Sequence, residues 1–139
     1  MYFEWKDNYE MGVKEVDDQH RKLFQIGRKL SDIIQSENVL HNYDEIERIL
    51  IELKNYTIEH FSKEEQFMKE HGYTDLVSHA MEHAFLRKKL MKIDSLKEPN
   101  HKTLVELVSF VSDWISQHIL ITDMKIRNFL ILVEKYPGA

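Results

Sequence analysis

The 139-residue chain has no cysteine, only four glycines and two prolines, and no purely apolar run longer than FLILV at residues 129–133. Without cysteine there are no disulfides, thiolate nucleophiles or thiolate metal sites, so a bound metal would use nitrogen and oxygen ligands. The scarcity of turn residues disfavours sandwiches and barrels, and the apolar run is too short to span a bilayer. The first residues, MYFEWKDNYE, lack the basic start and apolar stretch of a signal peptide, so we expect a cytoplasmic location.

Composition and charge indicate one ordinary globular domain over residues 1–139. Apolar residues make up 42% of the chain and charged residues 31%, and the length suits a single sizeable core. The net charge of −5 gives no reason to expect binding to nucleic acid or to an anionic membrane. The mixed, acidic surface shows no obvious large apolar patch, which predicts a monomer.

Four long segments have the residue spacing of amphipathic helices. Apolar residues recur every three or four positions at about residues 18–37, 43–70, 75–95 and 101–133. Asp17 or Asp18 is expected to cap the first helix, and Gly72 to end the second. The short connections predict an all-α fold, an antiparallel up-down four-helix bundle over residues 18–133.

The N-terminal residues do not share this helical spacing. Residues 1–17 are therefore expected to form an irregular arm. The aromatic side chains of this arm would pack on the outside of the bundle: Phe3, Trp5 and Tyr9.

The inward faces of the expected helices carry six ionisable side chains: His20, His60, Glu64, His79, His83 and His118. A buried imidazole or carboxylate without a partner costs a free energy comparable with the net stability of a small domain. One such residue is commonly a hydrogen-bonded core histidine, and a single pair spaced four apart occurs by chance. Six that converge from four helices need a common partner, and metal ions are natural partners of neutral imidazole and carboxylate.

The remaining histidines and the ligand count narrow the kind of metal site. His41, His71 and His101 lie at predicted helix starts or ends, so we interpret them as capping or surface residues. A single zinc ion needs only four ligands, so six candidates indicate two metals. Di-iron carboxylate bundles use Glu-x-x-His motifs, and the one such spacing here, Glu98 to His101, is interrupted by Pro99. A histidine-rich site disfavours high oxidation states and favours reversible chemistry.

Four segments resemble the ligand motifs of the hemerythrin family, in particular its single-domain bacterial members. They are VDDQH ending at His20, HFSKEE with His60 and Glu64, HAMEH from His79 to His83, and HILITD from His118 to Asp123. Their order and approximate separations match over essentially the whole chain. The family's N-terminal arm is similar at Trp5, Tyr9, Gly12, Val16 and Asp17. GYTD at residues 72–75 departs from many relatives, which have proline after the tyrosine, but this concerns a helix start and no ligand.

The resemblance adds Asp123, which the helical spacing did not predict. Five residues correspond to about 140° around an ideal helix from His118. Moving the register by one residue turns a better apolar set inward: Ile119, Asp123, Ile126, Leu130 and Val133. We therefore predict local overwinding or a π-type bulge between His118 and Asp123.

The resemblance implies two non-haem iron ions joined by an oxo or hydroxo bridge and by the carboxylates of Glu64 and Asp123. One iron would take three imidazoles, from His79, His83 and His118. The other would take the imidazoles of His20 and His60, which leaves one open position for dioxygen.

Further residues are expected to surround this centre. Apolar neighbours would keep it dry: Ile115, Phe24, Ile119 and Phe61. Ile115, one turn before His118, is expected to lie over the open position. Partners for the free imidazole N–H groups are sought among residues near the ligands in sequence: Gln19, Asp17, Tyr56 and Glu59.

The function that these expectations favour is reversible dioxygen binding, for carriage, storage or delivery to an unidentified protein recipient, by a protein that is not an enzyme. Alternatives on the same site are an oxygen or redox sensor, and an enzyme that reduces peroxide or nitric oxide. The sequence offers no general acid beyond the ligands and no fused output domain. A reversible oxy spectrum would favour carriage, and catalytic turnover of peroxide would favour the alternatives.

Overall fold

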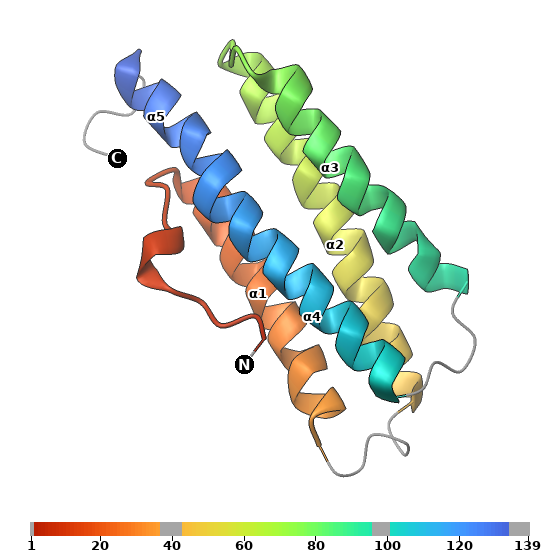
Figure 1. Cartoon of the computed structure of the whole chain (residues 1–139). Coiled ribbons are helices and arrows are strands. Elements are labelled where there is room, and N and C mark those ends of the chain that lie inside the picture. Colours follow the sequence, from red (N-terminus) through yellow and green to blue (C-terminus); the bar gives the residue numbers. More distant parts are fainter. Residues whose placement is uncertain (1, 37–42, 96–100, 134–139) are drawn as a thin grey trace.

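The structure is a computed structural model that describes residues 2–36, 43–95 and 101–133, and helices are the only regular elements in these ranges. Four rods pack side by side, and consecutive rods run in opposite directions (Figure 1). In chain order the elements are η1 (Asp7–Tyr9), α1 (Lys14–Ile34), α2 (Tyr43–Glu70), α3 (Leu76–Met91), η3 (Lys92–Ser95), α4 (His101–Gln117), η4 (His118–Asp123) and α5 (Met124–Leu132). The predicted up-down four-helix bundle is confirmed, and its fourth rod consists of α4, η4 and α5.

The first rod starts earlier than predicted. α1 begins at Lys14 and its N-cap is Val13, so the expectation that Asp17 or its neighbour caps the helix is wrong. Asp17 lies inside α1, and its carboxylate accepts hydrogen bonds from the backbone N–H groups of Met11 (2.8 Å) and Gly12 (3.0 Å). The carboxylate therefore ties the arm to the helix from within, and the irregular arm is shorter than expected.

The other helix ends agree with the sequence more closely. α2 has its predicted bounds, and Gly72 follows it in a left-handed conformation, with φ of 65°. His71 caps this end by donating from Nδ1 to a backbone carbonyl one turn earlier, at 2.8 Å. α1 and α3 end sooner than predicted, at Ile34 and Met91, and η3 continues α3. His101 is the exposed first residue of α4, whereas His41 lies outside the described residues.

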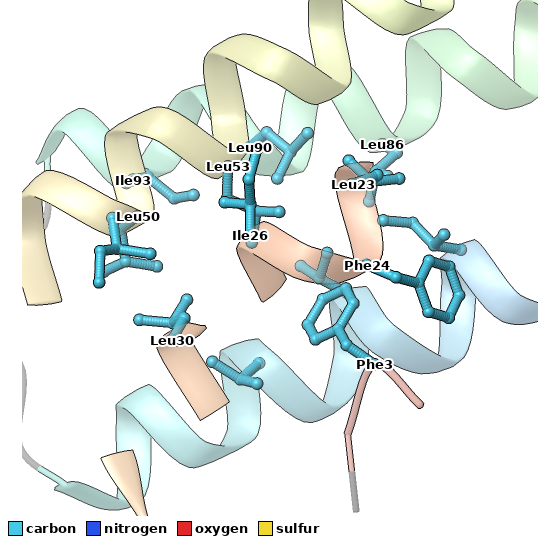
Figure 2. Packing of buried hydrophobic residues seen from close by; sticks show 14 of the residues in the cluster. Phe3, Leu23, Phe24, Ile26, Leu30, Leu50, Leu53, Leu86, Leu90 and Ile93 are labelled. Carbon is cyan, nitrogen blue, oxygen red and sulfur yellow. The ribbon is translucent and has the colours of Figure 1, made fainter. Parts of the chain in front are cut away.

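Two clusters of buried apolar side chains fill the bundle. The larger contains Leu23, Phe61 and Leu86, and Figure 2 shows part of it, with side chains from several rods pointing into one interior. The smaller contains Val16 and Phe67, together with residues of the arm and of α5. The polar candidates lie where the larger cluster meets the smaller one along the rods, so apolar side chains pack on both sides of them.

The arm is anchored on the bundle through Phe3, as predicted for its aromatic residues. The Phe3 backbone N–H donates to Ser112 Oγ at 2.9 Å, and the side chain is 2% exposed. Its ring lies so close to Gly27 that a Cβ there would be 2.4 Å from ring carbons. The ring also makes an edge contact with Phe24, at 5.9 Å between centroids. Because glycine has no Cβ, position 27 leaves room for the Phe3 ring, and the arm can pack against α1.

The predicted irregularity of the fourth rod is present. Residues His118–Asp123 form a turn of π-helix, and the Met124 N–H donates to the Ile119 carbonyl five residues earlier. Asp123 is fully buried, whereas Ile121 in the same turn is 56% exposed. The wider turn brings His118 and Asp123 to the same side of the rod.

Within the described chain, one stretch has the length and composition to cross a membrane, His101–Leu132, with a hydropathy of 1.3 over its best window. This stretch is the fourth rod, and it carries buried His118 and Asp123. A core rod of a helical bundle meets the same criteria of length and composition, so we interpret the stretch as a core element.

Candidate metal centre

All seven predicted ligands lie in one buried cluster, contributed by all four rods. α1 supplies His20, α2 and α3 supply two residues each, and η4 begins and ends with the last two. Their ligand-type atoms form two groups, in each of which all atoms lie within 4.8 Å of one another. One group is Glu64, His79, His83, His118 and Asp123, and the other is His20, His60, Glu64 and Asp123.

Glu64 belongs to both groups and divides its oxygens between them. Its Oε1 lies 2.9 Å from His79 Nε2 and 3.0 Å from His83 Nε2. Its Oε2 faces the other group, at 3.7 Å from His20 Nε2 and 3.5 Å from His60 Nε2. One carboxylate thus presents one oxygen to each group.

Asp123 divides its oxygens in the same way. Its Oδ1 lies 3.0 Å from His79 Nε2 and 3.1 Å from His118 Nε2. Its Oδ2 lies 3.2 Å from His20 Nε2. The two groups therefore share both carboxylates, which is the arrangement that a pair of neighbouring cations would require.

Several polar atoms of the cluster have no aligned hydrogen bond within the described residues. They are both ring nitrogens of His20, Glu64 Oε2, His79 Nδ1 and both oxygens of Asp123. In addition, His79 Nε2 and His83 Nε2 each lie 3.1 Å from His118 Nε2, so ring nitrogens face one another. Burial of polar atoms without partners is costly. Cations between the atoms that face one another, namely His20 Nε2, Glu64 Oε2 and the Asp123 oxygens, would give these atoms partners.

The spacing of the nitrogens also fits a metal ion. Two ligand atoms about 2.1 Å from one metal ion and at right angles to each other lie about 3.0 Å apart, whereas a tetrahedral site separates them by about 3.4 Å. The observed separations of 3.1 Å match the right-angled case. A set of imidazoles and carboxylates of this kind suits iron among the transition metals.

The carboxylates also determine the protonation of the imidazoles. Burial lowers the pKa of His118, but the charges and hydrogen bonds of Asp123 and Glu64 outweigh it and raise that pKa to about 10. The same balance raises the pKa values of His20 and His79 to about 9. Burial dominates at His60 and lowers its pKa to about 4. Burial would raise the pKa values of Glu64 and Asp123, yet both are lowered because the imidazoles face these carboxylates.

Three imidazoles donate their Nδ1–H groups to side chains of neighbouring helices. His60 donates to Gln19 Oε1 at 2.7 Å, and Gln19 was among the residues expected to do so. His83 donates to Glu65 Oε2 at 2.7 Å, and His118 to Glu82 Oε2 at 3.0 Å. Arg87 lies 3.0 Å from the same oxygen of Glu65. These bonds hold the rings so that each Nε2 faces the cluster.

Glu65 and Glu82 were not predicted from the sequence. Each directly precedes or follows a ligand in the chain, so each sits at the edge of an inward face, and that position was the available signal. The other expected partners contact different groups. Asp17 binds the arm, the Lys22 ammonium lies over the Tyr56 ring, and Glu59 pairs with Lys63 on the surface.

The four residues expected to wall the site are all buried: Ile115, Phe24, Ile119 and Phe61. The Phe61 ring stacks on His83, with centroids 4.0 Å apart and planes at 7°. Phe24 makes its ring contacts with the aromatic residues of the arm. Trp114, which was not expected here, stacks on His118 at 4.7 Å and 12°. Aromatic rings therefore cover the imidazoles of the larger group.

Comparisons with known proteins agree with this geometry. Residues 11–130 match the family described as Hemerythrin HHE cation binding domain. The chain is 38% identical to a bacteriohemerythrin of Clostridium acetobutylicum, over 87% of this chain and 95% of that protein. It is 27% identical to a myohemerythrin of Theromyzon tessulatum, over 92% of this chain and 93% of that protein. A crystal structure of wild-type hemerythrin has a TM-score of 0.73 and 31% identity, and the match covers 87% of this chain and 92% of the other. The chain therefore belongs to the hemerythrin family.

Proposed function

We propose that this protein binds dioxygen reversibly at a di-iron centre held by the seven clustered side chains. The observation that carries the proposal is the division of each shared carboxylate between two groups of imidazoles. Glu64 and Asp123 would bridge the two irons, and an oxo or hydroxo group would complete the bridge. Bound iron would supply the electrons for reversible dioxygen binding, and the chain would supply geometry and a dry interior.

The two ligand groups differ in their number of imidazoles, and this difference indicates which of them would bind dioxygen. The larger group brings three imidazoles to the shared carboxylates, whereas the smaller brings only His20 and His60. We infer that the smaller group keeps a position free for an external ligand. His60 is held by the Gln19 amide, so this side keeps a fixed imidazole without an added carboxylate charge.

Exclusion of water is the second task of the chain. The apolar residues proposed to do this are Ile115, Phe24, Ile119 and Phe61, each no more than 3% exposed. Ile115 lies one turn before His118 on the same rod, and we propose that it covers the free position. A dry site would slow protonation and loss of the bound, reduced dioxygen, and so keep binding reversible.

The buried ionisable groups favour a binding protein over an enzyme. Outside the seven ligands, the charged side chains buried in the described part of the chain are Asp17 and Lys54, and Tyr73 is also buried. Asp17 is engaged with backbone N–H groups of the arm. Lys54 lies on α2, nearly two turns before His60 in sequence. Neither Asp17 nor Lys54 is placed as a general acid for peroxide or nitric oxide reduction. The Tyr73 ring lies 6.3 Å from the His79 ring, between centroids, but burial and nearby carboxylates raise the pKa of Tyr73 to about 12, so its hydroxyl is a weak acid.

Metal content and an optical spectrum of aerobically purified protein test the proposal. We expect two iron ions per chain, one for each ligand group, and a spectrum that appears with oxygen and disappears on its removal over repeated cycles. Glu64→Ala should lose iron from both groups, because it removes a shared carboxylate. Zinc or manganese in place of iron, or iron with no oxygen-dependent spectrum, would refute the function.

A further inference from the structure

Exposed apolar side chains gather on one face of the bundle, on α3 and the neighbouring fourth rod. Val77, Met81 and Phe85 lie one turn apart on α3 and are 74%, 68% and 51% exposed. Phe110 and Ile121 are exposed on the fourth rod. We call these five residues the α3–α4 patch. The sequence had predicted a monomer because no such patch was evident, and the structure removes that reason.

The patch surrounds a groove that leads to the metal centre. Phe85, Phe110 and Ile121 line a groove of about 460 Å³, together with Trp114 and His118. Glu82, which holds the His118 ring, lines the same groove. A cover over the patch would therefore also close off this side of the cluster from water.

The charged side chains near Phe85 are placed so that they can pair with those of a second copy of the chain. A helix turns about 100° and rises about 1.5 Å per residue, so Glu82 and Lys89 lie on the same side of Phe85, at similar distances in opposite directions along α3. The Lys89 ammonium lies 5.8 Å from the ring centroids of both Phe85 and Phe110, which places its charge at the patch. If two α3 helices meet antiparallel about Phe85, each Glu82 faces the Lys89 of the other copy.

We propose that the α3–α4 patch is the interface of a homodimer, in which two copies of α3 pack antiparallel across a two-fold axis near Phe85. The pairing of each Glu82 with the Lys89 of the other copy makes such an interface self-complementary in charge, as a two-fold contact requires. The five exposed side chains of the patch are fewer than the roughly 20–30 residues that a standard interface contributes on each partner. The dimer should therefore dissociate on dilution.

Sedimentation of the iron-loaded protein over a range of concentrations tests the dimer. The mass should rise from 16.7 kDa in dilute solution to twice that value in concentrated solution. Phe85→Glu should abolish the rise, and Lys89→Glu should weaken it. Both side chains are exposed, so helicity and iron content should stay unchanged, and Met81→Lys provides a second variant if either fails to fold.

Leu132→Glu is the matched control, because Leu132 is 81% exposed outside the patch, near the end of α5. This variant should dimerise like the unmodified protein. A mass of 16.7 kDa at every concentration, or a dimer that survives Phe85→Glu, would overturn the proposal. The iron-free protein can be measured in the same way, so the result stands apart from the test of oxygen binding.

Discussion

Charged and neutral side chains hold different imidazoles of the cluster. His83 and His118 donate to carboxylates, of Glu65 and Glu82, whereas His60 donates to the neutral amide of Gln19. Burial tends to raise the pKa of Glu65, but the hydrogen bond from His83 and the charge of Arg87 lower it, so this carboxylate is ionised. The larger ligand group thus receives additional negative charge, which favours retention of a cation.

Glu82→Gln should weaken iron binding, because it keeps an acceptor for the His118 N–H group but removes the charge. We expect a loss of affinity of about 10- to 100-fold, measured by competition with an iron chelator. Glu59→Gln is the control, since Glu59 is exposed and pairs with Lys63 on the surface. Equal affinities for the two variants would show that Glu82 does not support the site.

Ile115→Ala should speed autoxidation of the iron-loaded protein, because it opens a cavity beside His118 that water can enter. Val111 lies one turn before Ile115 on α4 and is equally buried, so Val111→Ala makes a cavity at a greater distance from the ligands. Autoxidation followed by absorbance should be faster in the first variant only. Unchanged rates would remove Ile115 from the proposed wall.

Gly27→Ala should destabilise the protein, because its Cβ would lie 2.4 Å from carbons of the Phe3 ring. Overpacking of this kind costs about 1–3 kcal/mol. In a Phe3→Ala background the same substitution should be neutral or favourable, since alanine is the better helix former. Urea unfolding of the four proteins in this cycle measures the coupling, and an equal effect in both backgrounds would contradict the contact.

At the scale of the helical element, η4 shows how a spacing of five residues can serve one site. In a regular helix His118 and Asp123 would point about 140° apart, and the π turn removes that difference. The extra residue in the wider turn costs little packing energy, because Ile121 in this turn is exposed to solvent. The turn therefore sets the spacing of two ligands and the register of α5 together.

Deletion of Ile121 should convert η4 into a regular α-helical turn and keep both ligands inward, with the register of α5 intact. We expect iron content and the midpoint of thermal unfolding to stay close to those of the unmodified protein. Deletion of Lys125 is the control, because the helix register then shifts between Asp123 and the buried Ile126, and both cannot keep their places. Loss of iron in the first variant but not in the second would refute this account of the turn.

The helices and six of the seven clustered residues were predictable because apolar spacing and inward polar residues are local properties of the sequence, whereas Asp123 was expected only from the resemblance to hemerythrins. The start of α1 was not, since Val13 makes no side-chain cap and Asp17 instead binds the arm from inside the helix. Glu65 and Glu82 were missed because their partners belong to other helices, and packing alone decides which ring each one meets.

At the scale of the whole molecule, the cluster is a set of opposite charges in an apolar interior. His20, His79 and His118 have pKa values of about 9, 9 and 10, above the ordinary value of 6.5. Groups with raised pKa values stabilise the fold fully below the ordinary value, and this contribution is lost as the pH rises through the folded value. The lowered pKa values of Glu64 and Asp123 act in the opposite direction, and their contribution is lost in acid.

Under the proposed function, iron and protons would compete for the same imidazole nitrogens, so removal of iron should change how stability depends on pH. In protein stripped of iron by a chelator, the free energy of unfolding should fall between about pH 6.5 and pH 10, as His20, His79 and His118 lose their protons. In the iron-loaded protein the imidazoles are neutral ligands over this range, so the fall should be much smaller. Urea unfolding of both forms near the two pH limits measures the difference. Parallel curves would mean that the raised pKa values do not contribute to stability, whereas divergence above pH 6.5 would identify the metal as the replacement for the protons.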